Sequence, residues 1–125
     1  MSEMRTPLSR VRGLGSAKKG TEHFWLQRVT ALANIPLAVF FVSAIVAHAG
    51  ADFVTVTAFL SHPIVALVML LLILSMVWHM RLGLQVVIED YIHKERWKFG
   101  LLIALKFLGI TLGVVAVFSI LKLAL

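Results

Sequence analysis

Three long apolar segments constrain this chain more than any other feature. They run from about 29 to 49, from 63 to 87 and from 99 to 121, and the stretch Pro63–Trp78 contains no charged side chain. A helix of roughly 20 apolar residues matches the hydrocarbon thickness of a bilayer. Lipid offers no hydrogen-bond partner to an exposed backbone, so such segments cross it as helices. The pattern predicts an all-α membrane protein whose three transmembrane helices form a bundle.

The composition sets further limits on what this chain can be. Hydrophobic residues make up 60% of its 125 residues and charged residues only 14%, which excludes a soluble globular domain. There is no cysteine, so the chain itself cannot hold a disulfide, a thiolate zinc site or a cysteine-ligated iron–sulfur cluster. We expect one membrane domain at 21–125, preceded by a basic, disordered arm at 1–20.

The distribution of basic residues predicts the orientation in the membrane. Six Lys and Arg residues precede the first apolar segment and three lie in the 88–98 connection, whereas the 50–62 connection, which we expect to be a loop, has none. Cytoplasmic segments carry such an excess, so the N-terminus is expected inside and the C-terminus outside. The net charge of +6 is then explained by attraction of these basic residues to anionic lipid headgroups, and no nucleic-acid partner is needed.

Most of the polar chemistry at membrane depth gathers in the stretch Trp78–Tyr91, which reads WHMRLGLQVVIEDY. On a continuous helix His79 and Asp90 share one face, roughly 16 Å apart along the axis. Gly83 lies between them, and a small residue there lets a flat ligand or another backbone approach closely. An imidazole, a glycine, a carboxylate and the phenol of Tyr91 at one helix end favour a functional site.

A histidine inside a membrane helix is costly, and three roles compete for His79: a hydrogen bond between helices, a proton relay, or a metal ligand. Neutral imidazole is a common ligand of haem iron. Six-coordinate haem needs two ligands, but His48 and His62 belong at the outer surface while His79 lies about 24 Å below Pro63. If His79 binds haem, its second ligand is expected from another subunit.

The pattern H-x-x-x-G-x-x-x-x-x-x-D-Y, formed by His79, Gly83, Asp90 and Tyr91, resembles the hydrophobic membrane anchor subunit of succinate dehydrogenase, complex II. The three-helix plan and the length resemble that family too. So does the segment from Gly20 to Thr30, which reads G-T-E-H-F-W-x-x-R-x-T. Together these features cover nearly the whole chain.

The resemblance implies specific roles for four residues. In that family, the histidine matching His79 is an axial ligand of haem b, shared with a cytochrome b556-type membrane subunit. The tyrosine matching Tyr91 hydrogen-bonds ubiquinone beside the residue matching Asp90. The arginine matching Arg28 lies near the haem propionates. We therefore expect the three-helix bundle to pack with that partner membrane subunit.

The resemblance also implies the function of the whole assembly. The chain would anchor succinate:ubiquinone oxidoreductase, of the tricarboxylic acid cycle and the respiratory chain, in a bacterial inner membrane; a mitochondrial inner membrane is the less favoured location. It would be no enzyme on its own. Flavin and iron–sulfur clusters would lie in a flavoprotein subunit and an iron–sulfur subunit, the latter binding the anchor.

Two other classes of function stay open at this point. A small transport or channel subunit would use His79 and Asp90 as a proton relay. A haem-free structural anchor would use His79 as a hydrogen bond between helices. The sequence assigns no role to Arg81 or His23, while Lys106 is expected to extend its stem toward the inner headgroups. The working direction, succinate oxidation or fumarate reduction, is open as well.

Overall fold

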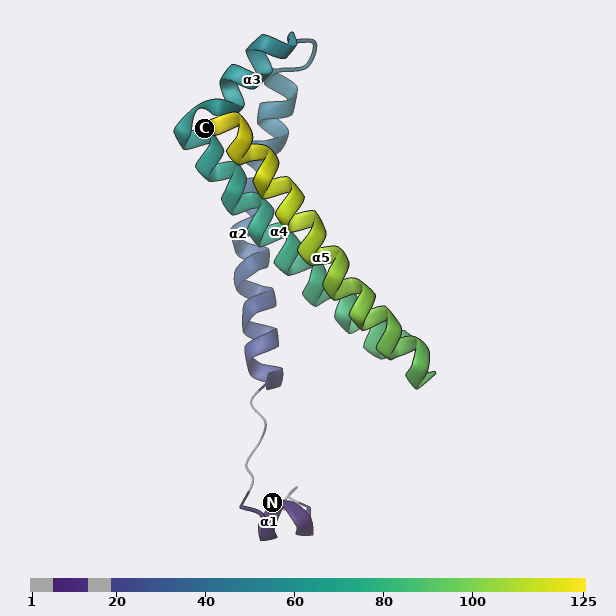
Figure 1. Cartoon of the computed structure of the whole chain (residues 1–125). Helices are drawn as coiled ribbons and strands as arrows, with labels where there is room; N and C mark the ends of the chain where they lie inside the picture. The colour runs from purple at the N-terminus through teal and green to yellow at the C-terminus, as the bar shows by residue number, and fades with distance from the viewer. Residues whose placement is uncertain (1–5, 14–18) are drawn as a thin grey trace.

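The structure is a computed structural model that describes residues 6–13 and 19–125, and it contains five helices within them (Figure 1). No strand occurs among these residues. The helices are α1 (Pro7–Val11), α2 (Lys19–Ala47), α3 (Phe53–Ser61), α4 (Pro63–Tyr91) and α5 (Glu95–Ala124).

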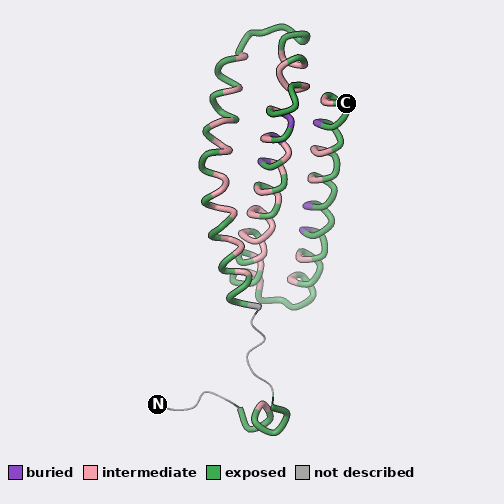
Figure 2. The backbone as a smooth tube through the Cα atoms, turned by 90° about the vertical axis from the view of Figure 1, so that its left-hand side faces the viewer, coloured by how far each residue is buried: buried purple, intermediate pink, exposed green. Residues whose placement is uncertain are grey.

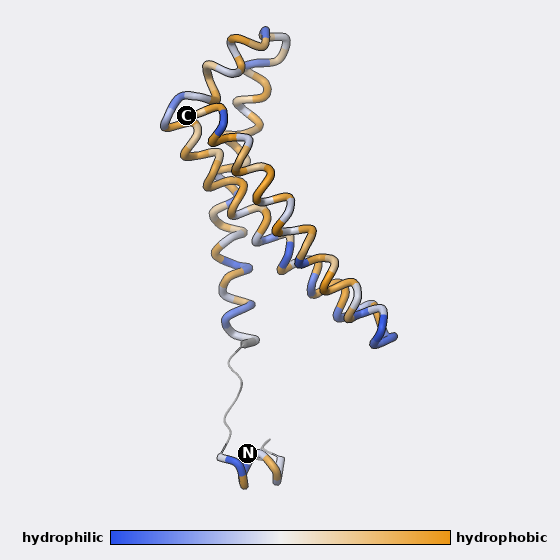
Figure 3. Tube along the Cα trace, in the orientation of Figure 1, coloured by the Kyte–Doolittle hydropathy of each residue, from blue (hydrophilic) through white to orange (hydrophobic). Residues whose placement is uncertain are grey.

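Three of these helices, α2 from Gly20 onward, α4 and α5, are long and apolar enough to cross a membrane. This confirms the predicted all-α membrane fold. Each helix continues beyond its apolar segment: α2 begins at Lys19, and α4 runs on to Tyr91. The reason is that backbone hydrogen bonds extend a helix through polar residues as readily as through apolar ones. Figure 3 shows the hydrophobic middles of the three helices and the hydrophilic α4–α5 connection.

The 50–62 segment is not the loop that its polar residues predicted, because most of it forms α3. Asp52 caps this helix by accepting a hydrogen bond from the Thr55 backbone N–H at 2.9 Å. Hydrogen bonds from Thr55 also hold the pKa of the Asp52 carboxyl below its usual value. The chain is extended at His62, and α4 begins at Pro63, whose missing N–H costs nothing in the first turn.

The predicted arm also contains ordered structure within its described part. Thr6 caps α1, where its hydroxyl accepts a hydrogen bond from the Ser9 backbone N–H at 3.2 Å. The other residues of the arm, 1–5 and 14–18, lie outside the described residues. The expectation of disorder is therefore wrong for Pro7–Val11.

Helix α4 lies at the centre of the bundle, since it packs against α2, α3 and α5. Helices α4 and α5 run side by side, whereas α2 diverges from them toward its N-terminal end (Figure 1). A small core joins Ala66, Met69 and Leu72 of α4 to Ile120 of α5, in the half of the bundle that lies toward α3. Most other side chains are exposed in the isolated chain (Figure 2). Such an apolar surface is expected of helices that lie in lipid.

Candidate functional site: the seam between α2 and α4

The imidazole of His79 lies half-buried where α4 meets α2. Its Nδ1 is 3.1 Å from Thr30 Oγ1. The Thr30 hydroxyl in turn lies 2.8 Å from the carbonyl oxygen of Leu26, one turn earlier on α2. Within the described part of the chain, Nε2 of His79 makes no hydrogen bond. One ring nitrogen is therefore held by a hydrogen bond to α2, and the other makes none with the described residues.

A second polar contact ties the same two helices together. The Ser75 hydroxyl, one turn before His79 on α4, donates to the carbonyl oxygen of Thr30 at 3.4 Å. The seam thus fixes both the side chain and the backbone of Thr30. In the sequence, Thr30 stands out only as the last residue of the Gly20–Thr30 family pattern. Its pairing with a residue 49 positions later has no signal in the sequence.

Two further polar side chains lie on the face of α2 that carries Thr30, because residues 7 before and 4 after it fall at nearly the same helical angle. These residues are His23 and Asn34. Their Nε2 and Oδ1 atoms are buried and have no hydrogen-bond partner within the described residues. Buried polar atoms are nearly always paired with protein or with ordered water, so each of these two atoms can accept or donate one further hydrogen bond to water or to a bound group.

Gly83 lies one turn below His79 on α4. A Cβ atom built there would meet nothing within 4 Å, so the surface beside the histidine is open. No cluster of three or more metal-ligating side chains occurs in the described ranges.

Asp90 and Tyr91 lie at the end of α4 and are exposed, with 74% of the Tyr91 side chain accessible. Neither makes a side-chain hydrogen bond with the described residues; the neighbouring Glu89 accepts one from Gln85 at 2.9 Å. Because α4 is continuous, Asp90 lies about 16 Å along the axis from His79. The predicted site residues of α4 therefore form two separate groups, His79 with Gly83 and Asp90 with Tyr91.

Arg28 lies two residues before Thr30, about 200° around α2, so it points away from the seam. Its guanidinium lies over the Phe24 ring, 5.0 Å from the centroid, and the side chain is exposed. The structure of the isolated chain does not bring it to His79.

The outer histidines are also separate from His79. Nδ1 of His48 lies 2.8 Å from the Ala44 carbonyl oxygen, and its ring packs against Phe59 at 4.2 Å between centroids. His62 is an exposed residue between α3 and α4. Both positions are explained by local structure at the end of the bundle that carries α3.

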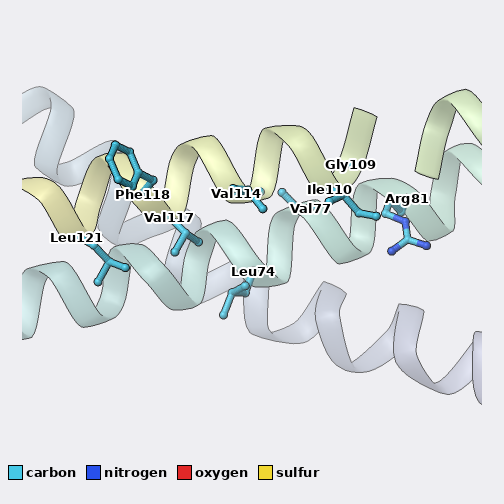
Figure 4. A pocket seen from close by; sticks show the side chains of 10 residues that line it. Leu74, Val77, Arg81, Gly109, Ile110, Val114, Val117, Phe118 and Leu121 are labelled. Atoms are coloured by element: carbon cyan, nitrogen blue, oxygen red, sulfur yellow. The ribbon is translucent and has the colours of Figure 1, made fainter. Parts of the chain in front are cut away.

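Arg81 occupies the opposite side of α4 and packs onto α5. It lies beside Gly109 at one end of an open, mainly apolar groove of about 410 Å³ between the two helices (Figure 4). Its guanidinium is 5.7 Å from the Trp78 ring centroid. A smaller cavity of about 150 Å³ is lined by Arg81, Gln85 and Lys106 among others. This arginine is thus a packing residue of the α4–α5 interface, remote from the His79 seam.

A family model described as succinate dehydrogenase/fumarate reductase transmembrane subunit matches residues 2–119. The chain belongs to this family. Among relatives, the succinate dehydrogenase hydrophobic membrane anchor subunit of Rickettsia bellii is 33% identical over 119 residues, covering 93% of this chain and 95% of the relative. The same-named subunit of Paracoccus denitrificans is 28% identical over 120 residues, covering 96% and 92%.

The succinate dehydrogenase membrane anchor subunit of Porphyra purpurea is 34% identical over 108 residues, covering 86% of this chain and 88% of the relative. No solved structure matches the chain.

Proposed function

We propose that this chain is the membrane anchor subunit of a succinate:ubiquinone oxidoreductase. Membership of the transmembrane-subunit family and the names of its full-length relatives support the proposal. The chain catalyses nothing alone in this account. It holds a flavoprotein subunit at a bacterial inner membrane through an iron–sulfur subunit, with its basic N-terminus on the cytoplasmic side.

The observation that carries the finer proposal is the state of the His79 ring. A metal-ligating histidine commonly donates its other ring N–H to a neighbouring acceptor, and Thr30 is placed for that role. With Nε2 unpartnered and open space beside Gly83, these residues fit an axial ligand of haem b. The unpaired atoms of His23 and Asn34 lie on the same face. A cytochrome b556-type membrane subunit would supply the second ligand, and the bound haem would supply one-electron transfer.

Tyr91 and Asp90 are proposed to contribute to the ubiquinone site. Both are exposed and unpaired at the inner end of α4, where an iron–sulfur subunit would dock. Tyr91 would donate its phenol proton in a hydrogen bond to a quinone oxygen, and Asp90 would orient the phenol or receive a proton from water. Arg28 would lie near the haem propionates only if the partner brings the haem edge around α2, because the chain alone directs it elsewhere.

One observation favours a second candidate, the haem-free structural anchor. The Thr30–His79 hydrogen bond joins two membrane helices and is a complete structural role in itself. The two candidates differ in one measurable respect: the structural anchor gives a colourless complex.

Purification of the tagged chain from membranes tests the anchor role. We expect it to carry a flavoprotein, an iron–sulfur subunit and a second membrane subunit, and to reduce ubiquinone with succinate. An unrelated tagged membrane protein of similar size from the same membranes is the control. A chain that purifies without flavin and without succinate-oxidising activity would contradict the proposal.

A further inference from the structure

We infer that Thr30 is a positioning residue that holds His79 in its Nδ1–H tautomer and thereby presents Nε2 as the metal-binding nitrogen. This inference rests on the proposed haem ligation but goes beyond it. It assigns the coordinating atom, and it assigns a role to a residue on a different helix.

The hydrogen bonds of the Thr30 hydroxyl indicate which ring nitrogen of His79 carries the proton. A threonine hydroxyl has one proton to donate and lone pairs that accept. Its Oγ1 lies 2.8 Å from the Leu26 carbonyl oxygen and 3.2 Å from that of Gln27, and both oxygens can only accept, so the hydroxyl proton is directed to the backbone. With that proton used, the contact of 3.1 Å to Nδ1 of His79 is one in which the ring donates. A neutral imidazole protonated at Nδ1 has its lone pair on Nε2.

The surroundings of Thr30 make this a fixed arrangement. Its carbonyl oxygen accepts from the Ser75 hydroxyl at 3.4 Å, one turn along α4 from His79. The threonine is therefore held between the backbone of its own helix and two side chains of the next. A hydroxyl held in this way restrains both the plane of the imidazole ring and its rotation.

The arrangement has an electronic consequence. A ring whose Nδ1–H is hydrogen-bonded is a more basic ligand at Nε2, and more basic ligands favour the oxidised metal. Removing the acceptor should therefore raise the haem midpoint potential. The potential follows the ratio of the affinities for the oxidised and the reduced metal, and a tenfold change in that ratio corresponds to about 59 mV.

The test uses the purified complex with all of its subunits and three variants. Thr30→Val keeps the shape and removes the acceptor, Thr30→Ser keeps a hydroxyl, and Ser43→Ala removes another α2 hydroxyl, one that bonds only the Val39 carbonyl of its own helix. We expect a higher midpoint potential and altered electron paramagnetic resonance g-values only for Thr30→Val. A role confined to helix packing would leave both readouts unchanged in complexes that assemble.

A second readout does not depend on haem occupancy. In the ¹⁵N-histidine-labelled, chemically reduced complex, with the signal assigned by its loss in His79→Gln, Nδ1 of His79 should carry a directly bonded proton. An unprotonated Nδ1 overturns the inference, even if Thr30→Val fails to assemble. A wild-type midpoint potential in Thr30→Val also overturns it.

The outcome for the histidine itself separates this inference from the proposed function. If His79→Leu removes the haem spectrum while Thr30→Val keeps the wild-type midpoint potential and g-values, only the role of Thr30 is wrong. If His79→Leu also leaves the spectrum unchanged, haem ligation fails and the role of Thr30 fails with it.

Discussion

Gly109 should be the least replaceable glycine of α5, because the stem of Arg81 lies where its side chain would be. A Cβ atom at position 109 would approach Arg81 Cδ at 2.6 Å and Cγ at 2.8 Å, distances that real side chains essentially never show. Gly113, one turn later on the same helix, is a matched control, since its Cβ would lie 3.7 Å from the nearest atom of Val77, an ordinary contact.

The two alanine variants allow the cost to be worked out by difference. Overpacking a close interface costs roughly 1–3 kcal/mol. Replacing a glycine inside a helix by alanine favours folding by roughly 0.8–1 kcal/mol at either position, so this gain cancels in the comparison. Gly109→Ala should therefore be about 1–3 kcal/mol less stable than Gly113→Ala. The cost is confined to the α4–α5 interface, which lies on the far side of α4 from His79.

The difference is measured by titrating the purified complex with denaturant and monitoring the release of this chain. A double-mutant cycle identifies its source: Arg81→Ala should make Gly109→Ala harmless and leave the effect of Gly113→Ala unchanged. Equal stability of the two glycine variants, or additive effects of Arg81→Ala and Gly109→Ala, would refute the reasoning.

Three other predictions concern topology, the quinone and the outer helix. Single cysteines replacing Ala51 and Lys94 should react with an impermeant thiol reagent from opposite faces of the membrane. Labelling of both from the same face would contradict the three-span orientation. Tyr91→Phe should slow ubiquinone reduction about tenfold, the effect of losing roughly 1.4 kcal/mol of hydrogen bonding, while reduction of a soluble acceptor persists; equal loss in both assays would make Tyr91 a structural residue. The lowered pKa of Asp52 means that its cap on α3 contributes stability above the unfolded pKa of about 3.9 and is lost as pH falls through the folded pKa. Hydrogen exchange at the Thr55 amide should therefore become faster in the wild-type protein than in the Asp52→Asn variant only in acid. Parallel exchange in the wild type and the variant at every pH would contradict this.

The transmembrane helices could be predicted because long apolar segments have one solution in lipid. Helix α3 could not, because hydropathy reports the environment of a segment and says little about its hydrogen bonds; Asp52 three residues before Thr55 is the capping signal that was missed. His79 stood out as a polar residue in an apolar helix. Its partner Thr30 did not, because a threonine is unremarkable in a membrane helix and the pairing depends on how α2 crosses α4.

The roles expected of Arg28, Asp90 and Tyr91 remain predictions. Each of these side chains is exposed in the isolated chain, and Arg28 stacks on Phe24 instead of lying against the seam. An exposed side chain makes few contacts within its own chain, so the residues around it give no sign of what it binds. Nε2 of His23 and Oδ1 of Asn34 are buried and also lack a hydrogen-bond partner within the described residues.

The optical spectrum of the purified complex carrying His79→Leu tests the central claim most directly. Matched variants at the two outer histidines, His48→Leu and His62→Leu, are the controls. The account predicts that the low-spin haem b absorption is lost or strongly altered in His79→Leu and retained in both controls. A His79→Leu complex with the wild-type spectrum and midpoint potential would contradict it.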